Sequence, residues 1–187
     1  MVLYTGVAWA ASEVLEDFES GPQVKVENNS HPDTQCLVVE DPGKTGNHVM
    51  KLSWAAHSGT HVAGSLSTPG AVVFREPGIY EVTVKVNLEQ CPPESRKMAL
   101  RVVDARNEAF QYSVPIEKAG EPGWTEMKWT INTNDPLPGA SKSWGDRVDG
   151  VMDFPVKFYG FAMGLKNRKT EGGTLLFDEI SVTRISD

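Results

Sequence analysis

Acidic residues near both ends of the chain are the ones whose types and spacing could support chemistry. The run Glu-Asp-Phe-Glu occupies positions 16–19, and Asp178 lies in the last β-rich run, at positions 172–182. Pairs of carboxylates hydrolyse glycosidic bonds, one acting as the acid and the other as the base or nucleophile. Carboxylate oxygens also suit a hard cation such as Ca²⁺. Because both runs are β-rich, we expect the two ends of the chain to pair in one sheet and to close a single domain.

Two histidines form a second arrangement that could support chemistry. His57 and His61 lie four positions apart in the segment 55–64, which is predicted to be a loop. A histidine can serve as the general base of a lyase or as a ligand of a transition metal. The sequence places no third ligand beside this pair, so neither role is favoured.

Composition narrows the classes of protein that the chain could represent. Its 187 residues, 40% hydrophobic and 23% charged, suit one globular domain over positions 1–187. Positions 1–12 are interpreted as a leader remnant or an artificial boundary. The formal net charge of −7, without a basic cluster, argues against a nucleic-acid partner. No apolar run reaches the roughly 18 to 20 residues of a membrane span.

The two cysteines leave two alternatives open. Cys36 and Cys91 lack the paired spacing of a zinc site. They are therefore either two free thiols or one disulfide bond.

Alternation of apolar and polar residues predicts short strands along most of the chain. The clearest strand spans 79–87, where every second residue is apolar, so that one face is core and the other is solvated. Further strands are expected from position 15 onward and at 37–39, 48–55, 71–74, 98–104, 110–114, 127–131, 156–165 and 174–183. About nine or ten strands without a long amphipathic helix predict an all-β fold, an antiparallel β-sandwich of the jelly-roll type.

Polar and aromatic residues on these strands could form a sugar-binding surface. Sugars are bound by flat aromatic rings, which cover the apolar faces of pyranoses, and by polar groups that replace the water around hydroxyls. Lys85, Arg101, Gln111 and Lys128 point outward on four predicted strands and would share a face if those strands are neighbours. Five residues are the candidate ligand contacts: Arg101, Gln111, Lys128, Trp144 and Tyr159. Three other tryptophans are assigned to core or edge packing: Trp54, Trp124 and Trp129.

Four short segments together resemble the galactose-binding-like β-jelly-roll carbohydrate-binding modules. They are Asp-Phe-Glu at 17–19, Gly-Ile-Tyr-Glu-Val-Thr-Val at 78–84, Gly-Trp-Thr at 123–125 and Leu-Phe-Asp-Glu-Ile-Ser-Val at 176–182. The resemblance covers nearly the whole chain. It implies a jelly roll with a structural calcium ion near the paired terminal strands, and a sugar site on a sheet or at loop tips. Carried onto this chain, it implies Glu19 and Asp178 as calcium ligands, with a main-chain oxygen near Lys51.

An enzyme remains an alternative, although the spacing of the carboxylates argues against it. Jelly-roll glucanases of the laminarinase type have one more residue between the first Glu and the Asp, so that all their carboxylates face one cleft. Here Glu16 would face away from Asp17 and Glu19, because adjacent residues of a strand point to opposite faces. Asp178 and its neighbour Glu179 would point apart for the same reason.

The favoured hypothesis is a non-catalytic module that binds a soluble polysaccharide or oligosaccharide. We expect it to be extracellular or secreted and to accompany a glycoside-degrading domain or enzyme. A scaffold or adhesion domain without sugar affinity is the remaining alternative, because a polar outer sheet face is also what any solvated sheet presents.

Overall fold

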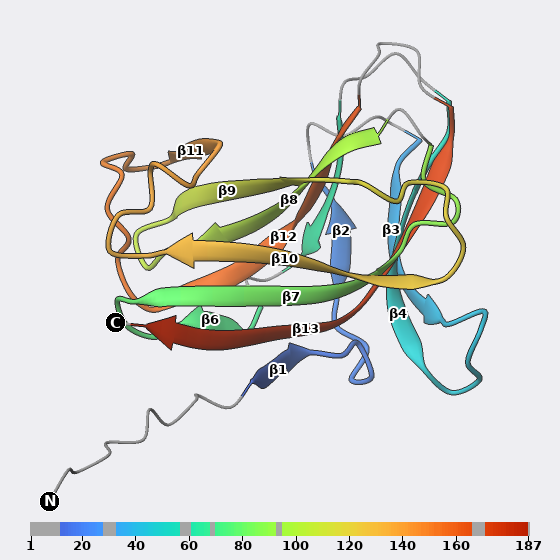
Figure 1. The fold of residues 1–187 in the computed structure, drawn as a ribbon, viewed down its shortest axis with the longest axis horizontal. Helices are drawn as coiled ribbons and strands as arrows, with labels where there is room; N and C mark the ends of the chain where they lie inside the picture. The colour runs from blue at the N-terminus through green and yellow to red at the C-terminus, as the bar shows by residue number, and fades with distance from the viewer. Residues whose placement is uncertain are drawn as a thin grey trace, which may run out of the picture.

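The structure is a computed structural model that describes residues 12–27, 33–56, 61–67, 70–92, 95–165 and 171–186, without the side chains of residues 95, 96 and 165. His57 and positions 1–11, nearly all of the expected leader, lie outside these residues. The described chain contains 13 strands in two antiparallel sheets and no helix (Figure 1). No described helix could therefore serve as a membrane-spanning segment.

The first sheet, sheet A, contains both ends of the described chain. Its strand order is β10 (Trp124–Asn132), β7 (Ile79–Asn87), β13 (Gly173–Ser186), β4 (His48–Trp54) and β3 (Gln35–Glu40), and β1 (Glu13–Glu16) also pairs with β13. The predicted pairing of the two chain ends is confirmed, because Val14 lies opposite Ser181. The partner strand ends at Glu16, before the turn that carries Glu19.

The second sheet, sheet B, lies behind sheet A in Figure 1. Its strand order is β11 (Lys142–Gly145), β9 (Glu108–Pro115), β8 (Ser95–Val103), β12 (Val156–Leu165), β5 (His61–Leu66) and β2 (Val24–Val26), and β6 (Val72–Phe74) also pairs with β12. We call the face of each sheet that points away from the other sheet its outer face.

The core fills the space between the two sheets. In β7, the predicted alternation is confirmed, because Tyr80, Val82, Val84 and Val86 are buried and the residues between them are half-buried. Aromatic rings join the layers at the centre: Phe161 of β12 stacks on Phe177 of β13 with 4.4 Å between ring centroids. Burial of these apolar faces is the main source of stability in such a sandwich.

The predicted all-β antiparallel sandwich is confirmed, with more strands than expected. Three short strands were missed: β2, β5 and β11. The loop prediction for 55–64 is wrong from His61 onward, because β5 begins there. Small residues of β5, such as Ala63 and Gly64, weaken the apolar alternation that identifies a strand, although they are buried in the structure.

The four strands expected to share a polar face if they were neighbours are not all neighbours, so they form no common face. Lys85 and Lys128 lie on sheet A, whereas Arg101 and Gln111 lie on sheet B, because β7 and β10 belong to a different layer from β8 and β9. Of the two alternatives for the cysteines, the structure shows two thiols: Cys36 and Cys91 are both buried and are not joined in a disulfide bond.

Candidate functional site

Four of the five predicted ligand contacts meet on the outer face of sheet B. The Arg101 Nε donates a hydrogen bond to Gln111 Oε1 at 2.9 Å. The guanidinium carbon of Arg101 lies 5.2 Å from the centre of the Trp144 ring. Tyr159 joins them through Glu27, whose Oε2 accepts a 3.3 Å hydrogen bond from the Tyr159 hydroxyl and lies 3.9 Å from an Arg101 nitrogen. Arg101 is therefore the centre of the cluster.

Local irregularities of the strands place two of these residues. In β12, Phe158 and Gly160 lie opposite the adjacent residues Val102 and Arg101, so Tyr159 is the extra residue of a β-bulge. Both Phe158 and Phe161 point into the core, which leaves Tyr159 on the outer face beside Arg101.

Trp144 reaches the same surface through β11. This short strand pairs with β9 and places Trp144 opposite Ala109. The preceding Ser141 anchors it, because its main-chain N–H donates to the carbonyl of Gln111 and its hydroxyl lies 2.9 Å from the hydroxyl of Ser113. Within the segment 136–150, residues 142–145 therefore form a strand of sheet B.

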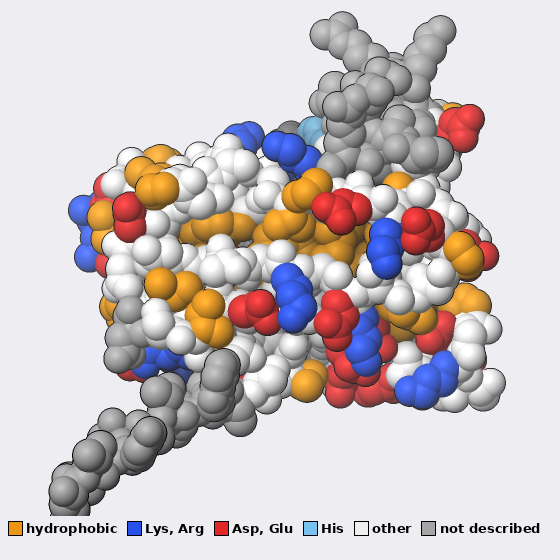
Figure 2. Space-filling view, in the orientation of Figure 1, with side chains coloured by type: hydrophobic (Ala, Val, Ile, Leu, Met, Phe, Trp, Pro, Cys, Tyr) orange, Lys and Arg blue, Asp and Glu red, His pale blue; other side chains and the backbone are white. Residues whose placement is uncertain are grey.

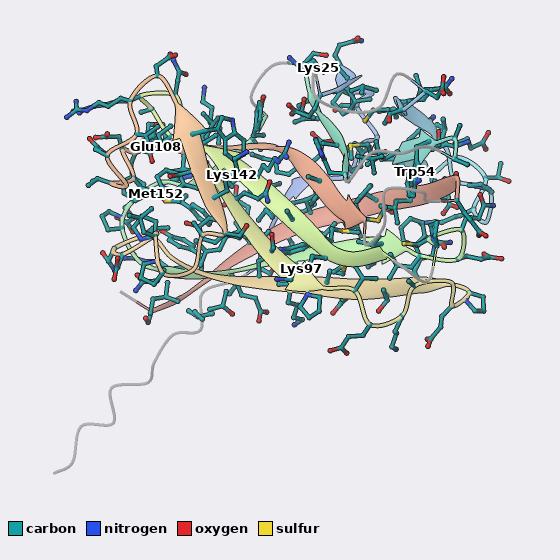
Figure 3. All side chains as sticks on the ribbon, turned by 90° about the horizontal axis from the view of Figure 1, so that it is seen from above. Lys25, Trp54, Lys97, Glu108, Lys142 and Met152 are labelled. Atoms are coloured by element: carbon teal, nitrogen blue, oxygen red, sulfur yellow. The ribbon has the colours of Figure 1, made fainter. Side chains whose placement is uncertain are left out.

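A hollow of about 350 Å³ lies beside this cluster, and we call it the cationic hollow. Its floor is made of small side chains, Ala99 and Ala162, which pack with Ala63. Its rim carries His61 and three permanently charged side chains, Lys97, Arg101 and Lys142, together with Gln111, Ser113 and Ser141. Two of the cations, Lys97 and Lys142, are labelled over sheet B in Figure 3. No carboxylate is among the described residues that line the hollow.

The electrostatics of the cationic hollow are those of a site with positive potential. Burial lowers the pKa of the His61 imidazole, and the charges of Arg101 and Lys142 lower it further. The side chain of Arg101 is only 12% exposed, and burial lowers its pKa, but a guanidinium stays charged in proteins. Within the described part of the chain, neither Lys97 nor Lys142 has an ion-pair partner. The Nζ atom of Lys142 lies 5.4 Å from the centre of the Trp144 ring.

Sequence reasoning missed four members of this surface: Glu27, His61, Lys97 and Lys142. Lys97 could have been found from strand alternation, because it precedes Arg101 by four positions and so points to the same face. Glu27 could not, because it follows the short strand β2, which reaches Arg101 only through the pairing of β2, β5, β12 and β8.

Lys128 is not part of this surface. It lies on the outer face of sheet A, where its Nζ contacts Glu81 Oε1 at 3.2 Å. Lys85 of the neighbouring strand is likewise paired with Glu179. Figure 2 shows blue and red side chains next to one another over this sheet. Such exposed pairs are typical of a solvated surface.

The predicted metal ligands Glu19 and Asp178 contact two adjacent residues, His48 and Asn47. Glu19 Oε1 accepts a 2.7 Å hydrogen bond from the His48 N–H, and Oε2 lies 3.0 Å from His48 Nδ1. Asp178 Oδ2 accepts a 3.2 Å hydrogen bond from the Asn47 amide. Lys51 is not brought to this place: it lies three residues further along β4, opposite Leu176.

The chemistry of this place fits a hard cation in part. Each carboxylate residue adjoins a residue with a positive φ: Phe18, before Glu19, has φ 60°, and Glu179, after Asp178, has φ 44°. Such strained residues gather at functional sites. No third Asp, Glu, His or Cys of the described residues completes a cluster with them. A calcium ion here would therefore take its other ligands from main-chain and amide oxygens of the loop 41–47.

The other carboxylates of the run 16–19 serve the turn. Glu16 Oε1 accepts a hydrogen bond from the Phe18 N–H at 2.8 Å, and Asp17 Oδ1 accepts one from the Glu19 N–H at 3.1 Å. Burial raises the pKa of Glu16, although the bond from Phe18 opposes this shift. These contacts give Glu16 and Asp17 a structural role.

Comparisons with known proteins connect this fold to carbohydrate-binding modules. A family 11 carbohydrate-binding module from Clostridium thermocellum, solved with a β-1,3-1,4-mixed-linked tetrasaccharide, matches 94% of this chain and 96% of its own, with a TM-score of 0.55 and 12% identity. A xylan-binding domain of Paenibacillus barcinonensis matches 96% of this chain and 99% of its own, with a TM-score of 0.50 and 11% identity. The chain therefore has the β-sandwich fold of these modules, as the sequence resemblance implied.

The same fold occurs inside larger enzymes. An arabinose-bound α-L-arabinofuranosidase matches 96% of this chain with a TM-score of 0.54 and 14% identity, and the chain spans only 27% of that protein. No protein-family model matches the chain, and no curated protein matches its sequence.

Proposed function

We propose that this protein is a non-catalytic carbohydrate-binding module that holds an anionic glycan in the cationic hollow of sheet B. The observation that carries the proposal is the lining of that hollow: its described residues include three permanent cations and no carboxylate, in a chain of net charge −7, and Glu27, the carboxylate beside Arg101, is not in the lining. An acidic protein that gathers cations in one concave place favours a negatively charged ligand there.

The hollow also offers the groups that sugar hydroxyls require. Gln111, Ser113 and Ser141 place an amide and two hydroxyls on one rim. Stripped hydroxyls must find such partners for binding to be favourable.

Trp144 has a positioning role in this proposal. Its ring lies under Arg101 and near Lys142, and a cation over an aromatic face is held there by the ring's quadrupole. The guanidinium is thereby presented in a fixed orientation for a carboxylate or sulfate group, which it can contact through two parallel hydrogen bonds. Tyr159 supplies the second aromatic surface, linked to Arg101 through Glu27.

The arrangement of the carboxylates supports binding without catalysis. Glu27, beside the hollow, is engaged by Tyr159 and faces Arg101, and no carboxylate among the described lining residues could form an acid and base pair with it. The fold's occurrence within glycoside-degrading enzymes supports a role beside a catalytic domain in an extracellular system.

Affinity electrophoresis on matched polysaccharides tests the proposed ligand class. We expect polygalacturonate or a sulfated galactan in the gel to retard the protein, and neutral galactan to retard it much less. The retardation by the acidic gel should decline between 0.1 M and 1 M NaCl, because the Debye length falls from about 10 Å to about 3 Å. The two acidic gels distinguish a carboxylate from a sulfate ligand.

Each other outcome of this experiment has a definite meaning. Retardation by neutral galactan alone would show that the protein binds sugar but that its ligand is not an anionic glycan, which would contradict the proposed ligand class. No retardation by any gel would support a scaffold without sugar affinity, and release of reducing sugar would support an enzyme.

We also propose that calcium stabilises the fold at Glu19 and Asp178. A ligand that binds only the native state stabilises it by about 2.7 kcal/mol at 100 times its Kd, which corresponds to roughly 5–10 °C in Tm for a chain of this size. We expect Tm to rise on addition of CaCl₂ and to return with EGTA. The variant Asp178→Asn should lose this response, whereas Asp149→Asn, in a distant loop, should keep it. An unchanged Tm in the native protein would contradict the calcium proposal.

A further inference from the structure

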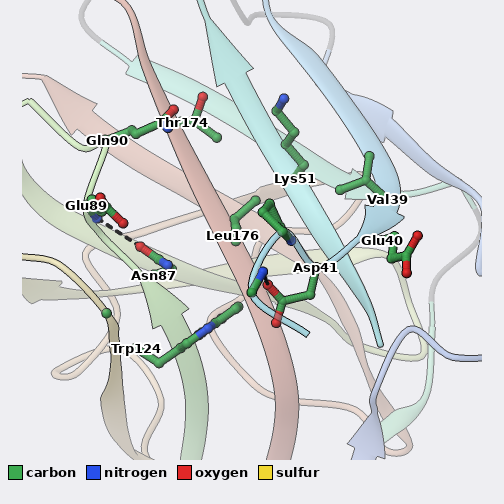
Figure 4. A pocket seen from close by; sticks show the side chains of 13 residues that line it. Val39, Glu40, Asp41, Lys51, Asn87, Glu89, Gln90, Trp124, Thr174 and Leu176 are labelled. Carbon is green, nitrogen blue, oxygen red and sulfur yellow. Dashed lines mark hydrogen bonds between the residues drawn. The ribbon is translucent and has the colours of Figure 1, made fainter. Parts of the chain in front are cut away.

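We propose that the outer face of sheet A carries a second glycan-binding site, separate from the cationic hollow, which takes a neutral sugar chain. The site is a groove of about 640 Å³ at one end of the sheet, and we call it the Trp124 groove (Figure 4). It lies on the opposite layer of the sandwich from Arg101. The proposal does not depend on whether the cationic hollow binds its own ligand.

The strand register builds the floor of this groove from a row of outward residues on β4, β13, β7 and β10, and the row continues beyond the groove to Leu37 of β3. Leu37 lies opposite Lys51, Lys51 opposite Leu176, Leu176 opposite Asn87, and Asn87 opposite Trp124. The row therefore crosses the whole sheet with one outward residue from each strand. Trp124, the first residue of the edge strand β10, is 38% exposed, so of the two placements predicted for it, core or edge, the core is excluded. Figure 4 shows its side chain reaching from β10 across β7 towards β13.

Two turns with internal hydrogen bonds form the walls. In the turn after β3, Asp41 Oδ1 accepts the Gly43 N–H at 2.8 Å, and the Asp41 N–H donates to the Asn47 carbonyl at 2.7 Å. In the turn after β7, Asn87 Oδ1 accepts the Glu89 N–H at 3.0 Å. The groove is therefore formed before any ligand arrives, which reduces the entropy lost on binding.

The polar side chains in the groove are not engaged with one another, which distinguishes this end of the face from the rest. Further along the same face, Lys85 and Lys128 are neutralised by Glu179 and Glu81. Within the described part of the chain, no hydrogen bond or ion pair engages the side chains of Lys51, Gln90 or Thr174, all of which line the groove. An ammonium, an amide and a hydroxyl are therefore available beside an exposed indole.

These groups match a neutral pyranose chain. A flat indole face covers the apolar face of a sugar ring, and amide, hydroxyl and ammonium groups replace the water around its hydroxyls. The charge of the groove differs from that of the cationic hollow, because among its described lining residues Glu40, Asp41 and Glu89 stand against one cation, Lys51. An anionic glycan would be repelled here, so the two faces select different chains.

Indole resonances provide a direct test of the full chain. The protein has five tryptophans, so the ¹⁵N-labelled chain gives at most five indole N–H signals, and Trp124→Phe identifies one of them. We expect oligosaccharides of mixed-linkage β-glucan, xylan or mannan to shift the Trp124 signal without shifting the Trp144 signal. Oligogalacturonate should not shift the Trp124 signal. The absence of a Trp124 shift with all three neutral oligosaccharides would overturn the proposal.

Affinity measurements on variants complete the test. Trp124→Ala should weaken binding of the responding neutral oligosaccharide about tenfold or more, as expected for an aromatic anchor. Leu37→Ala is the matched control, because Leu37 lies in the same row, is 51% exposed and does not line the groove. Its affinity should equal that of the native protein. Full affinity in Trp124→Ala, with an unchanged melting curve, would show that the groove is not the site.

Discussion

Replacing Arg101 with alanine is expected to lower affinity for an acidic polysaccharide by about 30-fold or more. Buried residues at the centre of a binding surface commonly cost 2 kcal/mol or more when truncated, and arginine is enriched among them. Arg101 is such a residue, because it contacts Gln111, Trp144 and Glu27 and is 12% exposed. Its removal deletes the best-positioned cation of the cationic hollow.

The loss should also expose the role of Glu27. This carboxylate is 15% exposed and faces Arg101, so in Arg101→Ala it becomes a buried negative charge beside the ligand site. Arg101→Lys keeps the positive charge but replaces the planar guanidinium that lies over Trp144 and donates to Gln111 through Nε, so it should lose an intermediate amount of affinity.

Lys128→Ala provides the control for this prediction, because it removes one cation from the other sheet. Calorimetric titration with oligogalacturonate and a thermal melt of each variant provide the measurements. An Arg101→Ala variant that binds as well as the native protein, or a Lys128→Ala variant that is weakened equally, would mean that overall charge rather than the cationic hollow determines binding.

Replacing Phe161 with alanine is expected to destabilise the fold by about 3–5 kcal/mol, the range for a large aromatic residue deleted from a core. Phe161 is fully buried and stacks on Phe177 of the opposite sheet. Its ring also lies 5.1 Å from that of Phe158 and 6.3 Å from that of Trp129. The substitution leaves a cavity that neighbouring strands cannot fill without losing their pairing.

Urea unfolding monitored by tryptophan fluorescence measures this effect. The control is Val151→Ala, because Val151 is 59% exposed and should change the free energy of unfolding by less than about 0.5 kcal/mol. Equal midpoints for the native protein and Phe161→Ala would contradict the view that this aromatic stack is the centre of the core.

The proposals for the two faces together describe a module that holds two different chains. The cationic hollow and the Trp124 groove lie on opposite sheets of one sandwich and have opposite charge preferences. A polymer network that contains both an acidic and a neutral glycan could therefore be bound on both faces, which raises retention through effective concentration.

Local sequence patterns were sufficient to identify the strands whose two faces differ strongly in hydrophobicity. In β7, strict alternation identified both the strand and its buried residues, and the strand expected at 48–55 is β4, in which Met50, Leu52 and Trp54 are buried. The same patterns failed for β5 and β11. Both strands are short and contain small or polar residues, so their strand structure comes from pairing with β12 and β9.

The sequence by itself determined the all-β antiparallel sandwich, the pairing of the chain ends, and four side chains of the cluster around Arg101, two of which, Arg101 and Gln111, line the cationic hollow. Alternation along a strand decides which residues share a face, because neighbouring side chains point to opposite sides of the backbone. Only the tertiary structure decided which faces lie on the same sheet. The order of strands in a sheet depends on contacts between residues far apart in the chain, so it separated Lys128 from Arg101, brought Glu27 to Arg101, and left Trp124 exposed above a groove.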